Sequence, residues 1–157
     1  MLPRRSILLL AGALLATACG AGDSDYADAV RRHWPSEQAV ARDRAALLAD
    51  HAERFEEGAA MASRIAASFG SGNNVGEGQA EAAAESRAGQ AQAAYFARSE
   101  FVTAHGVSCA SAAPSPGRNC EMGITIKGPD GKTQDIRGAW RFDEVDGRLA
   151  VVGGVGR

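Results

Sequence analysis

The stretch of sequence that decides the fold is residues 122–152, MGITIKGPDGKTQDIRGAWRFDEVDGRLAVV. Large apolar residues alternate with polar ones on both sides of a Gly-Pro-Asp-Gly segment, and again before an Asp-Gly pair. Alternation with a period of two is typical of strands with one buried face, and both Gly-containing segments are strong turn signals. The pattern predicts three strands, at about residues 120–127, 133–142 and 148–153.

A fourth strand is predicted just before these, at about residues 99–109. Phe101, Thr103 and Val107 would share one face of it. Four strands joined by short connections form an antiparallel meander, which commonly has one apolar face and one polar face. The apolar face requires a cover, and the preceding part of the chain has to supply it.

Residues 25–98 have the period of helices rather than strands. Pro35 predicts the end of a short helix at about 25–34, and Ser36 is a good N-cap for a long helix at about 36–69. Gly58 is the only glycine in this second helix, and its apolar residues recur at helical spacing. The apolar stripe, which we expect to cover the sheet, comprises Val40, Leu47, Leu48, Phe55, Ala59, Ala62, Ile65 and Phe69.

A glycine-rich loop at 70–78 predicts a break before an alanine-rich helix at about 79–98. The sequence therefore predicts an α+β fold, in which an N-terminal helical hairpin packs on a C-terminal four-strand antiparallel β-meander, as a single domain over residues 25–157. The alanines favour close packing of the two helices. The alternative is a coiled-coil face that docks a partner.

The amino terminus has the pattern of an export signal. Arg4 and Arg5 precede an apolar segment at residues 6–15, which leads into Ala16-Thr17-Ala18-Cys19. This arrangement resembles the lipobox of bacterial lipoproteins. The resemblance implies a cleaved signal peptide at 1–18, diacylglycerol on the Cys19 sulfur, and a tether at 19–24. Two alternatives are an ordinary secretory signal followed by a chance cysteine, and export by the twin-arginine route on Arg4 and Arg5.

Gly20 follows the lipobox cysteine, where an aspartate in lipoprotein families commonly retains the protein at the inner membrane. The resemblance thus implies a lipid-anchored protein of the cell envelope, at the outer membrane and facing the periplasm. Removal of the signal leaves 15 basic residues against 19 acidic ones, a formal net charge of −4. Because binding to nucleic acid requires a clustered basic excess, we expect no nucleic-acid partner.

Two cysteines remain after Cys19, and they flank a Pro/Gly/Ser-rich segment at 110–119. In an oxidising compartment an even pair is most simply a disulfide, so we predict a Cys109–Cys120 bridge. A redox or metal-binding pair is the alternative. Neither a Cys-x-x-Cys spacing nor a nearby histidine supports it.

No catalytic, cofactor or metal motif is recognisable. His33, His51 and His105 are far apart in the sequence, and Glu53, Glu56 and Glu57 lie on the side expected to face water. The acidic turn at 143–147 has too few ligands for a calcium loop. Trp140 is expected in the core rather than as a platform for a ligand. A pocket, if one exists, should lie between the sheet near Trp140 and the helices.

These features predict a small envelope lipoprotein that is not an enzyme and acts by binding another envelope component. The closing stretch is loosely similar to the final strands of cystatin-like and NTF2-like domains, which implies a ligand-pocket protein or enzyme as the alternative. A second alternative is an inhibitor or immunity factor that blocks an exported enzyme through the 110–119 loop. The sequence leaves the oligomeric state open.

Overall fold

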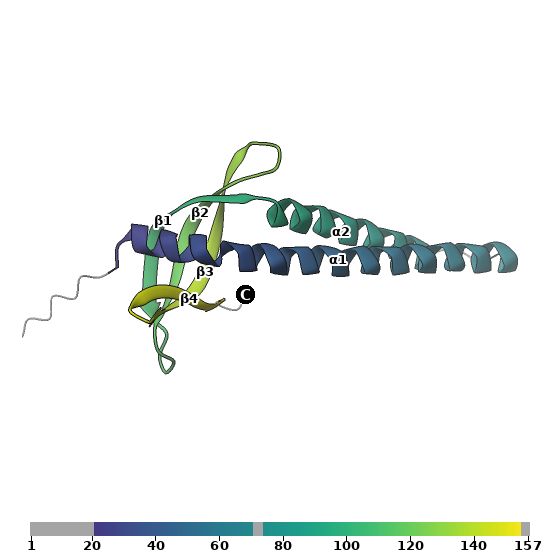
Figure 1. Ribbon diagram of the computed structural model, residues 1–157. Helices are drawn as coiled ribbons and strands as arrows, with labels where there is room; N and C mark the ends of the chain where they lie inside the picture. Colours follow the sequence, from purple (N-terminus) through teal and green to yellow (C-terminus); the bar gives the residue numbers. More distant parts are fainter. Residues whose placement is uncertain (1–20, 71–73, 155–157) are drawn as a thin grey trace, which may run out of the picture.

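The computed structural model describes residues 21–70 and 74–154. Two helices precede a four-stranded sheet in which each strand pairs antiparallel with the next, in the order β1-β2-β3-β4 (Figure 1). The predicted α+β class and the meander are confirmed. Cys19 and the signal peptide lie outside the described residues. The elements are α1 Asp23–Phe69, α2 Asn74–Ala97, β1 Glu100–Ser111, β2 Arg118–Lys127, β3 Thr133–Val145 and β4 Arg148–Gly154.

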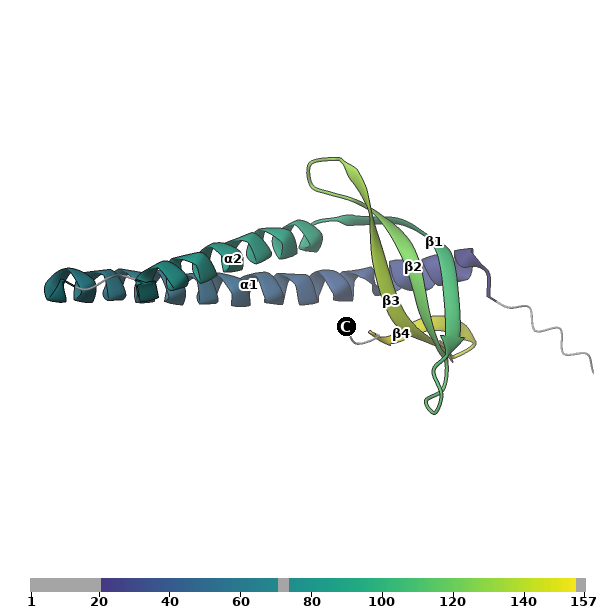
Figure 2. The same ribbon diagram turned by 180° about the vertical axis from the view of Figure 1, so that it is seen from behind.

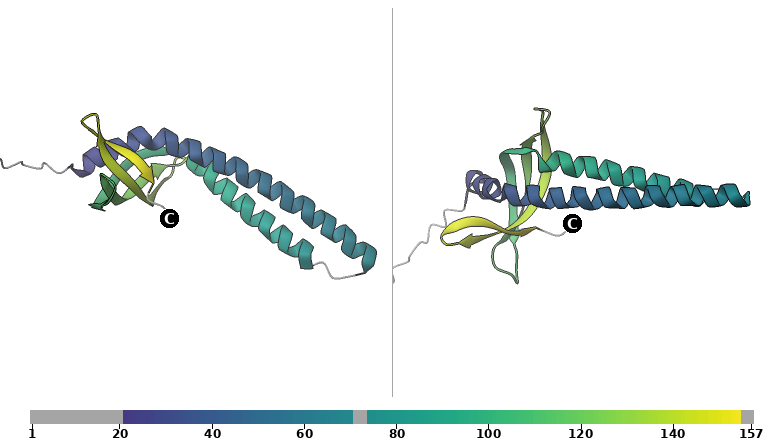
Figure 3. Two further views of the ribbon diagram at one scale, coloured as in Figure 1. Left: turned by 90° about the horizontal axis from the view of Figure 1, so that it is seen from below. Right: turned by 45° about the vertical axis from the view of Figure 1, so that its right-hand side comes forward.

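The prediction that Pro35 divides the first helical region was wrong, because α1 runs through it as one arched helix (Figure 3). Proline lacks an N–H and removes one helical hydrogen bond, an effect of about 3 kcal/mol in a helix interior. Contacts on both sides compensate, since Trp34 and Gln38 each donate a hydrogen bond to the Ser99 carbonyl. Ser36 is therefore inside the helix and not its N-cap.

The helix begins earlier than predicted, within the tether assigned to 19–24. Gly22 is the N-cap, and its N–H donates to the Asp25 carboxylate at 2.9 Å. Asp23 and Asp25 in the first turn also oppose the positive end of the helix dipole. The part of the tether that the structure describes as non-helical is only Ala21 and Gly22.

The first turns of α1 cover the apolar face of the sheet. Tyr26 meets Phe142 of β3 edge to face, with ring centroids 5.0 Å apart, and Trp34 stacks at a tilt on Phe101 of β1. Ile124, which lies near the centre of β2, is fully buried. The buried cluster comprises Tyr26, Ala27, Ala29, Val30, Trp34, Ala104, Cys120, Met122, Ile124, Ile126, Trp140 and Phe142. The apolar stripe of 36–69 is therefore not the main cover of the sheet.

Both edge strands are tied to α1 by neighbouring arginines. Arg31 donates to the Val102 carbonyl of β1 at 3.3 Å, and Arg32 donates to the Leu149 carbonyl of β4 at 2.8 Å. An edge strand exposes unpaired backbone groups that can recruit other strands. These two bonds occupy one such carbonyl on each edge and fix how α1 crosses the sheet.

Beyond the sheet, α1 and α2 lie side by side as a projecting antiparallel hairpin (Figure 2). Small residues form much of its interior: Ala52 and Ala83 are buried, and Leu48 packs against Gly89. Helix α2 starts at Asn74 rather than at residue 79, so the glycine-rich loop is shorter than predicted. Arg87 of α2 forms a two-pronged ion pair with Glu56 of α1, at 2.6 and 2.8 Å.

Strand β1 is less regular than its sequence pattern predicts. Its pairing with β2 shifts between Phe101 and Thr103 and again between His105 and Ser108, where Gly106 has a φ of +62°. Each shift moves the following residues to the other face. Ala104 is therefore buried and Thr103 exposed, the reverse of the prediction that placed Thr103 with Phe101 and Val107.

Candidate functional site

A groove of about 880 Å³ lies at the base of the hairpin, where both helices meet the sheet. This is the position that the sequence indicates for a pocket, beside Trp140. Helix α1 contributes Val40 and Arg44, α2 contributes Gln92 and Phe96, and β3 contributes Ile136, Arg137 and Trp140. We call this the junction groove.

Trp140 forms one wall of the junction groove and is held by a polar pair. Its side chain is buried, as predicted, and its Nε1–H donates to Glu37 Oε1 at 2.8 Å. The same oxygen lies 3.3 Å from His33 Nε2, one turn earlier on α1. The ring also lies against Gly138, where any added side chain would meet it. Glu37 therefore fixes the orientation of the indole.

The lining of the junction groove combines an apolar floor with a polar mouth. Val40, Phe96 and Ile136 supply apolar surface, and Arg44 and Gln92 supply donors. This composition suits a bound segment with an apolar core and acidic or carbonyl groups at its edges.

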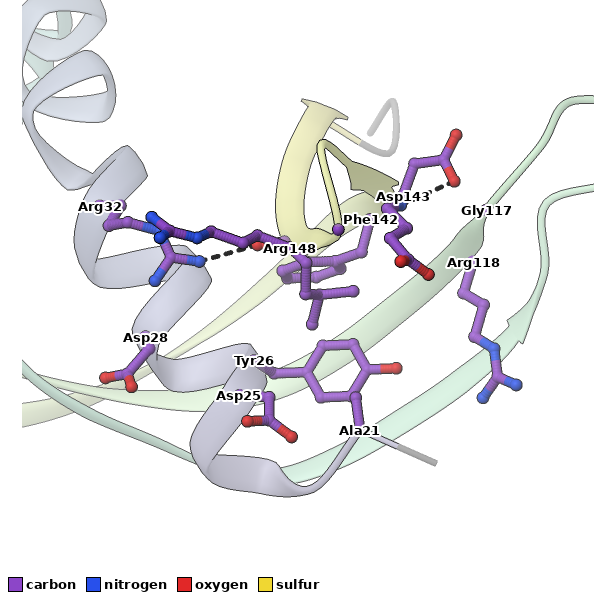
Figure 4. A pocket seen from close by; sticks show the side chains of 13 residues that line it. Ala21, Asp25, Tyr26, Asp28, Arg32, Gly117, Arg118, Phe142, Asp143 and Arg148 are labelled. Carbon is purple, nitrogen blue, oxygen red and sulfur yellow. Dashed lines mark hydrogen bonds between the residues drawn. The ribbon is translucent and has the colours of Figure 1, made fainter. Parts of the chain in front are cut away.

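A second cavity, of about 630 Å³, lies where α1 begins (Figure 4). Several of its charged side chains bond other groups of the protein. Asp25 caps α1, Asp28 pairs with Arg31 at 2.7 Å, and Arg32 bonds the Leu149 carbonyl. Arg32 thus holds the helix start against β4, and the two aspartates act at the start of α1 itself.

The predicted Cys109–Cys120 disulfide is confirmed. The two residues face each other across β1 and β2, with the Cα atoms 4.1 Å apart, and Cys120 is fully buried. Both strands continue past the bridge, so the non-strand connection is 112–117 rather than 110–119. The loop on which the inhibitor alternative depends is thus shorter than expected.

The structure does not bring the three histidines together. His33 pairs with Glu37 on α1, His51 is exposed on the hairpin, and His105 of β1 lies against Gly123 of β2. Within residues 21–70 and 74–154, no three His, Cys, Asp or Glu side chains are arranged to hold a metal ion. The acidic segment 143–147 includes the turn into β4.

Glu53, Glu56 and Glu57 of α1 are exposed, as predicted, and they are not clustered for acid–base chemistry. The hydrogen bond from Arg87 lowers the pKa of the Glu56 carboxyl. At the C-terminal end of α2, the Tyr95 hydroxyl donates to Asp130 at 3.1 Å. Partial desolvation and then this bond raise the pKa of Tyr95. Both pairs join separate elements and have a structural role.

The sequence did not predict that large apolar side chains are exposed on the hairpin. The exposed fractions are 64% for Val40, 56% for Leu47, 65% for Met61, 52% for Ile65 and 81% for Phe69. Length is the signal that could have revealed them. A helix over 36–69 is roughly 50 Å long, whereas a ten-residue strand is roughly 33 Å long and crosses the helix at an angle. The sheet cannot cover such a stripe.

Neither helix, over the ranges that the structure describes, is long and apolar enough to cross a bilayer. Comparison of the chain with protein-family models, with curated proteins and with solved structures gave no match.

Proposed function

We propose that this chain is an exported, lipid-anchored lipoprotein of the cell envelope that acts without catalysis, by binding another envelope component through its helical hairpin. The observation that carries this proposal is the set of large apolar side chains exposed along the hairpin, from Val40 to Phe69. Single exposed apolar residues are ordinary, but a row of them on one projecting element is typical of an interaction surface.

The shape of the molecule supports a binding role. Helix α1 is 47 residues long, which corresponds to about 70 Å, and only its first turns are used to cover the sheet. The rest of the hairpin projects beyond the sheet, which covers neither of its broad sides (Figure 1). It therefore offers a long surface to a partner.

The proposed anchor would attach to the end of the molecule opposite the hairpin tip. Cys19 precedes the start of α1 by only four residues, and the sheet packs on the first turns of this helix. Two or three acyl chains on Cys19 would give stable attachment to the outer membrane. The sheet end would then be held near the lipid, and the hairpin would extend into the periplasm or along the membrane.

The anchor is tested by a Cys19→Ala substitution in the full-length chain, with labelling by an acyl-chain analogue and membrane fractionation. We expect labelling to be lost and the protein to leave the membrane fraction. A Ser24→Ala variant, changed in the first turn of α1 and retaining the thiol, is the matched control. Labelling that persists in the Cys19→Ala variant would exclude the lipoprotein proposal.

The binding role is tested in intact cells with a photo-reactive amino acid at Leu47 or Phe69. Asp135, which is exposed on β3, provides a control position away from the hairpin. We expect discrete crosslinked bands from both hairpin positions and none from the control. A hairpin that gives no crosslinked species at either position would contradict the proposal.

The junction groove favours one second candidate, a ligand-binding protein, because it is concave and is lined by Trp140 and Phe96. A small ligand seated there should change the fluorescence of Trp140 and leave that of Trp34 unaltered. Screening the wild type and a Trp140→Phe variant in parallel separates the fluorescence response of Trp140 from that of Trp34. This candidate is rejected if every ligand response persists in Trp140→Phe.

A further inference from the structure

The exposed flank of α1 carries a second heptad pattern, beside the one that faces α2. We call it the outer stripe. Its members are separated by alternating steps of four and three residues, which keeps them on one face of a helix. Val40 and Arg44 line the junction groove, and Leu47 continues the same row beyond it. The outer stripe comprises Val40, Arg44, Leu47, His51, Arg54, Gly58, Met61 and Ile65.

The hairpin has its smaller residues inside and its larger ones outside. The inner row of α1, which faces α2, is mostly alanine, with Leu48 and Phe55 as its two large members. All of its positions except Phe55 are buried or half-buried: Ala41, Ala45, Leu48, Ala52, Ala59, Ala62 and Ala66. The four large apolar residues of the outer stripe are each more than half exposed. A two-helix layer of this kind buries little apolar area by itself. Another helical layer on the outer stripe would bury the larger residues.

The outer stripe is matched to itself when two copies run antiparallel. A two-fold axis between residues 52 and 53 brings an apolar residue to each end of the interface. Such an interface makes every contact twice. The facing pairs would be Val40 with Ile65, Arg44 with Met61, Leu47 with Gly58, and His51 with Arg54.

The charges beside the axis also favour this direction. Within one copy, Asp50 and Arg54 form an ion pair at 3.0 Å, and both are exposed. In the antiparallel pair, Asp50 of each copy, next to His51, would lie close to Arg54 of the other, so that these four charges alternate in sign around the axis. A parallel pair would instead set Arg44 against Arg44 and Arg54 against Arg54, and like charges in contact are unfavourable.

The available area is sufficient for a stable dimer. The outer stripe extends over 26 residues, about 38 Å of helix, and the hairpin is about 20 Å wide. Each copy would therefore bury roughly 750 Å², close to the about 800 Å² per partner of a standard interface. We infer that a second copy of this chain covers the outer stripe, and that the two hairpins form an antiparallel four-helix bundle.

This inference rests on the proposed function, because it names the first partner of the hairpin. The bundle would place the two sheets, and the two starts of α1, at opposite ends of the dimer. From residue 23 to the axis is about 44 Å of helix, so the two attachment points would be about 90 Å apart. The dimer would then lie along a membrane or connect two of them.

The first test is the oligomeric state of the full exported chain, measured by analytical ultracentrifugation at increasing concentration. Leu47→Asp places two charges in the middle of the interface, one from each copy. Ala60→Asp is the matched control, with the same new side chain at an exposed position of α1 away from the outer stripe. We expect wild type and Ala60→Asp to be dimers and Leu47→Asp to dissociate at least about 100-fold more readily. Far-UV circular dichroism must show the same helix content in all three.

The second test fixes the direction, in a Cys19→Ala background that keeps the native disulfide. Val40→Cys mixed with Ile65→Cys should form an intermolecular disulfide, and neither variant should do so alone. Crosslinking of Val40→Cys to itself would contradict the antiparallel arrangement. A monomeric wild type, or a Leu47→Asp variant that dimerises as well as wild type, would overturn the inference.

The outcomes separate the inference from the function on which it rests. If the photo-reactive residue at Leu47 captures only a different protein, the second copy is the wrong partner and the binding role stands. If Leu47 and Phe69 capture nothing and the chain is monomeric, both proposals are wrong.

Discussion

Removing both hydrogen-bond donors to the Ser99 carbonyl should destabilise the protein by more than the two single changes added together. Ser99 is fully buried where α2 ends and β1 begins. Its carbonyl accepts from Trp34 Nε1 at 2.9 Å and from Gln38 Nε2 at 2.8 Å, on either side of Pro35 in α1. The relevant variants are Trp34→Phe, Gln38→Leu and the double variant.

The expected magnitudes follow from what each variant leaves behind. Gln38→Leu removes one hydrogen bond, worth about 1 kcal/mol. Trp34→Phe removes another and weakens the ring contacts to Phe96 and Phe101, at 4.9 and 5.7 Å, so a loss of about 2 kcal/mol is expected. In each single variant the carbonyl keeps one donor. The double variant leaves the buried Ser99 carbonyl without a donor. This should add about 1–3 kcal/mol to the summed losses of the two single variants.

The coupling is measured by urea unfolding of the four proteins, followed by circular dichroism and extrapolated linearly to water. Trp140→Phe combined with Gln38→Leu is the control, because the Trp140 N–H donates to Glu37 rather than to Ser99. That pair should be additive. A coupling below about 0.5 kcal/mol between Trp34 and Gln38 would refute the shared-acceptor explanation.

Three further predictions concern single elements. Replacing both Cys109 and Cys120 by serine should lower the free energy of unfolding by about 3 kcal/mol, measured against urea, since the bridge closes a short loop in the unfolded chain; unchanged stability would contradict this. Pro35→Ala should raise the melting temperature, because alanine restores an N–H and favours helix by up to about 3 kcal/mol; a lower melting temperature would show that α1 requires the proline. Arg87→Gln should be less stable than wild type at neutral pH. The Glu56 pKa is lowered in the folded protein, so the ion pair contributes fully above the ordinary value of 4.5 and is lost as the pH falls through the lowered one. The two stabilities should then converge in acid, and a difference that persists at low pH would exclude the ion pair as its cause.

The sheet was predictable because its signals are local. Alternation around Ile124 and Trp140 reports which side of each strand is buried, and the Pro-Asp-Gly and Asp-Gly segments report where the chain turns. The disulfide is predictable for the same reason, because Cys109 and Cys120 lie near the ends of two strands joined by a short connection. The shifts in β1 were not predictable, since residues 101–109 read as a regular strand and only the pairing with β2 shows the irregular positions.

The candidate site was predictable in position but not in content. Trp140, as a large apolar residue on the inner face of β3, indicates where a pocket would lie, but nothing in its neighbourhood identifies Glu37 as its hydrogen-bond partner, 103 residues away. The apolar stripe was predictable from the sequence, but the prediction that it covers the sheet was wrong. A helical period shows that one face is apolar, and it does not show which surface covers that face.

By itself, the sequence determined the order and type of the elements, the disulfide pair and an amino terminus that resembles a lipoprotein signal. Only the tertiary structure decided that α1 passes through Pro35 and covers the sheet with its first turns, leaving Leu47, Met61 and Ile65 exposed on a projecting hairpin. The reason is the range of the interactions. Strand alternation and turns depend on residues a few positions apart, whereas the continuity and placement of α1 depend on Ser99 and Leu149, 61 to 117 residues along the chain.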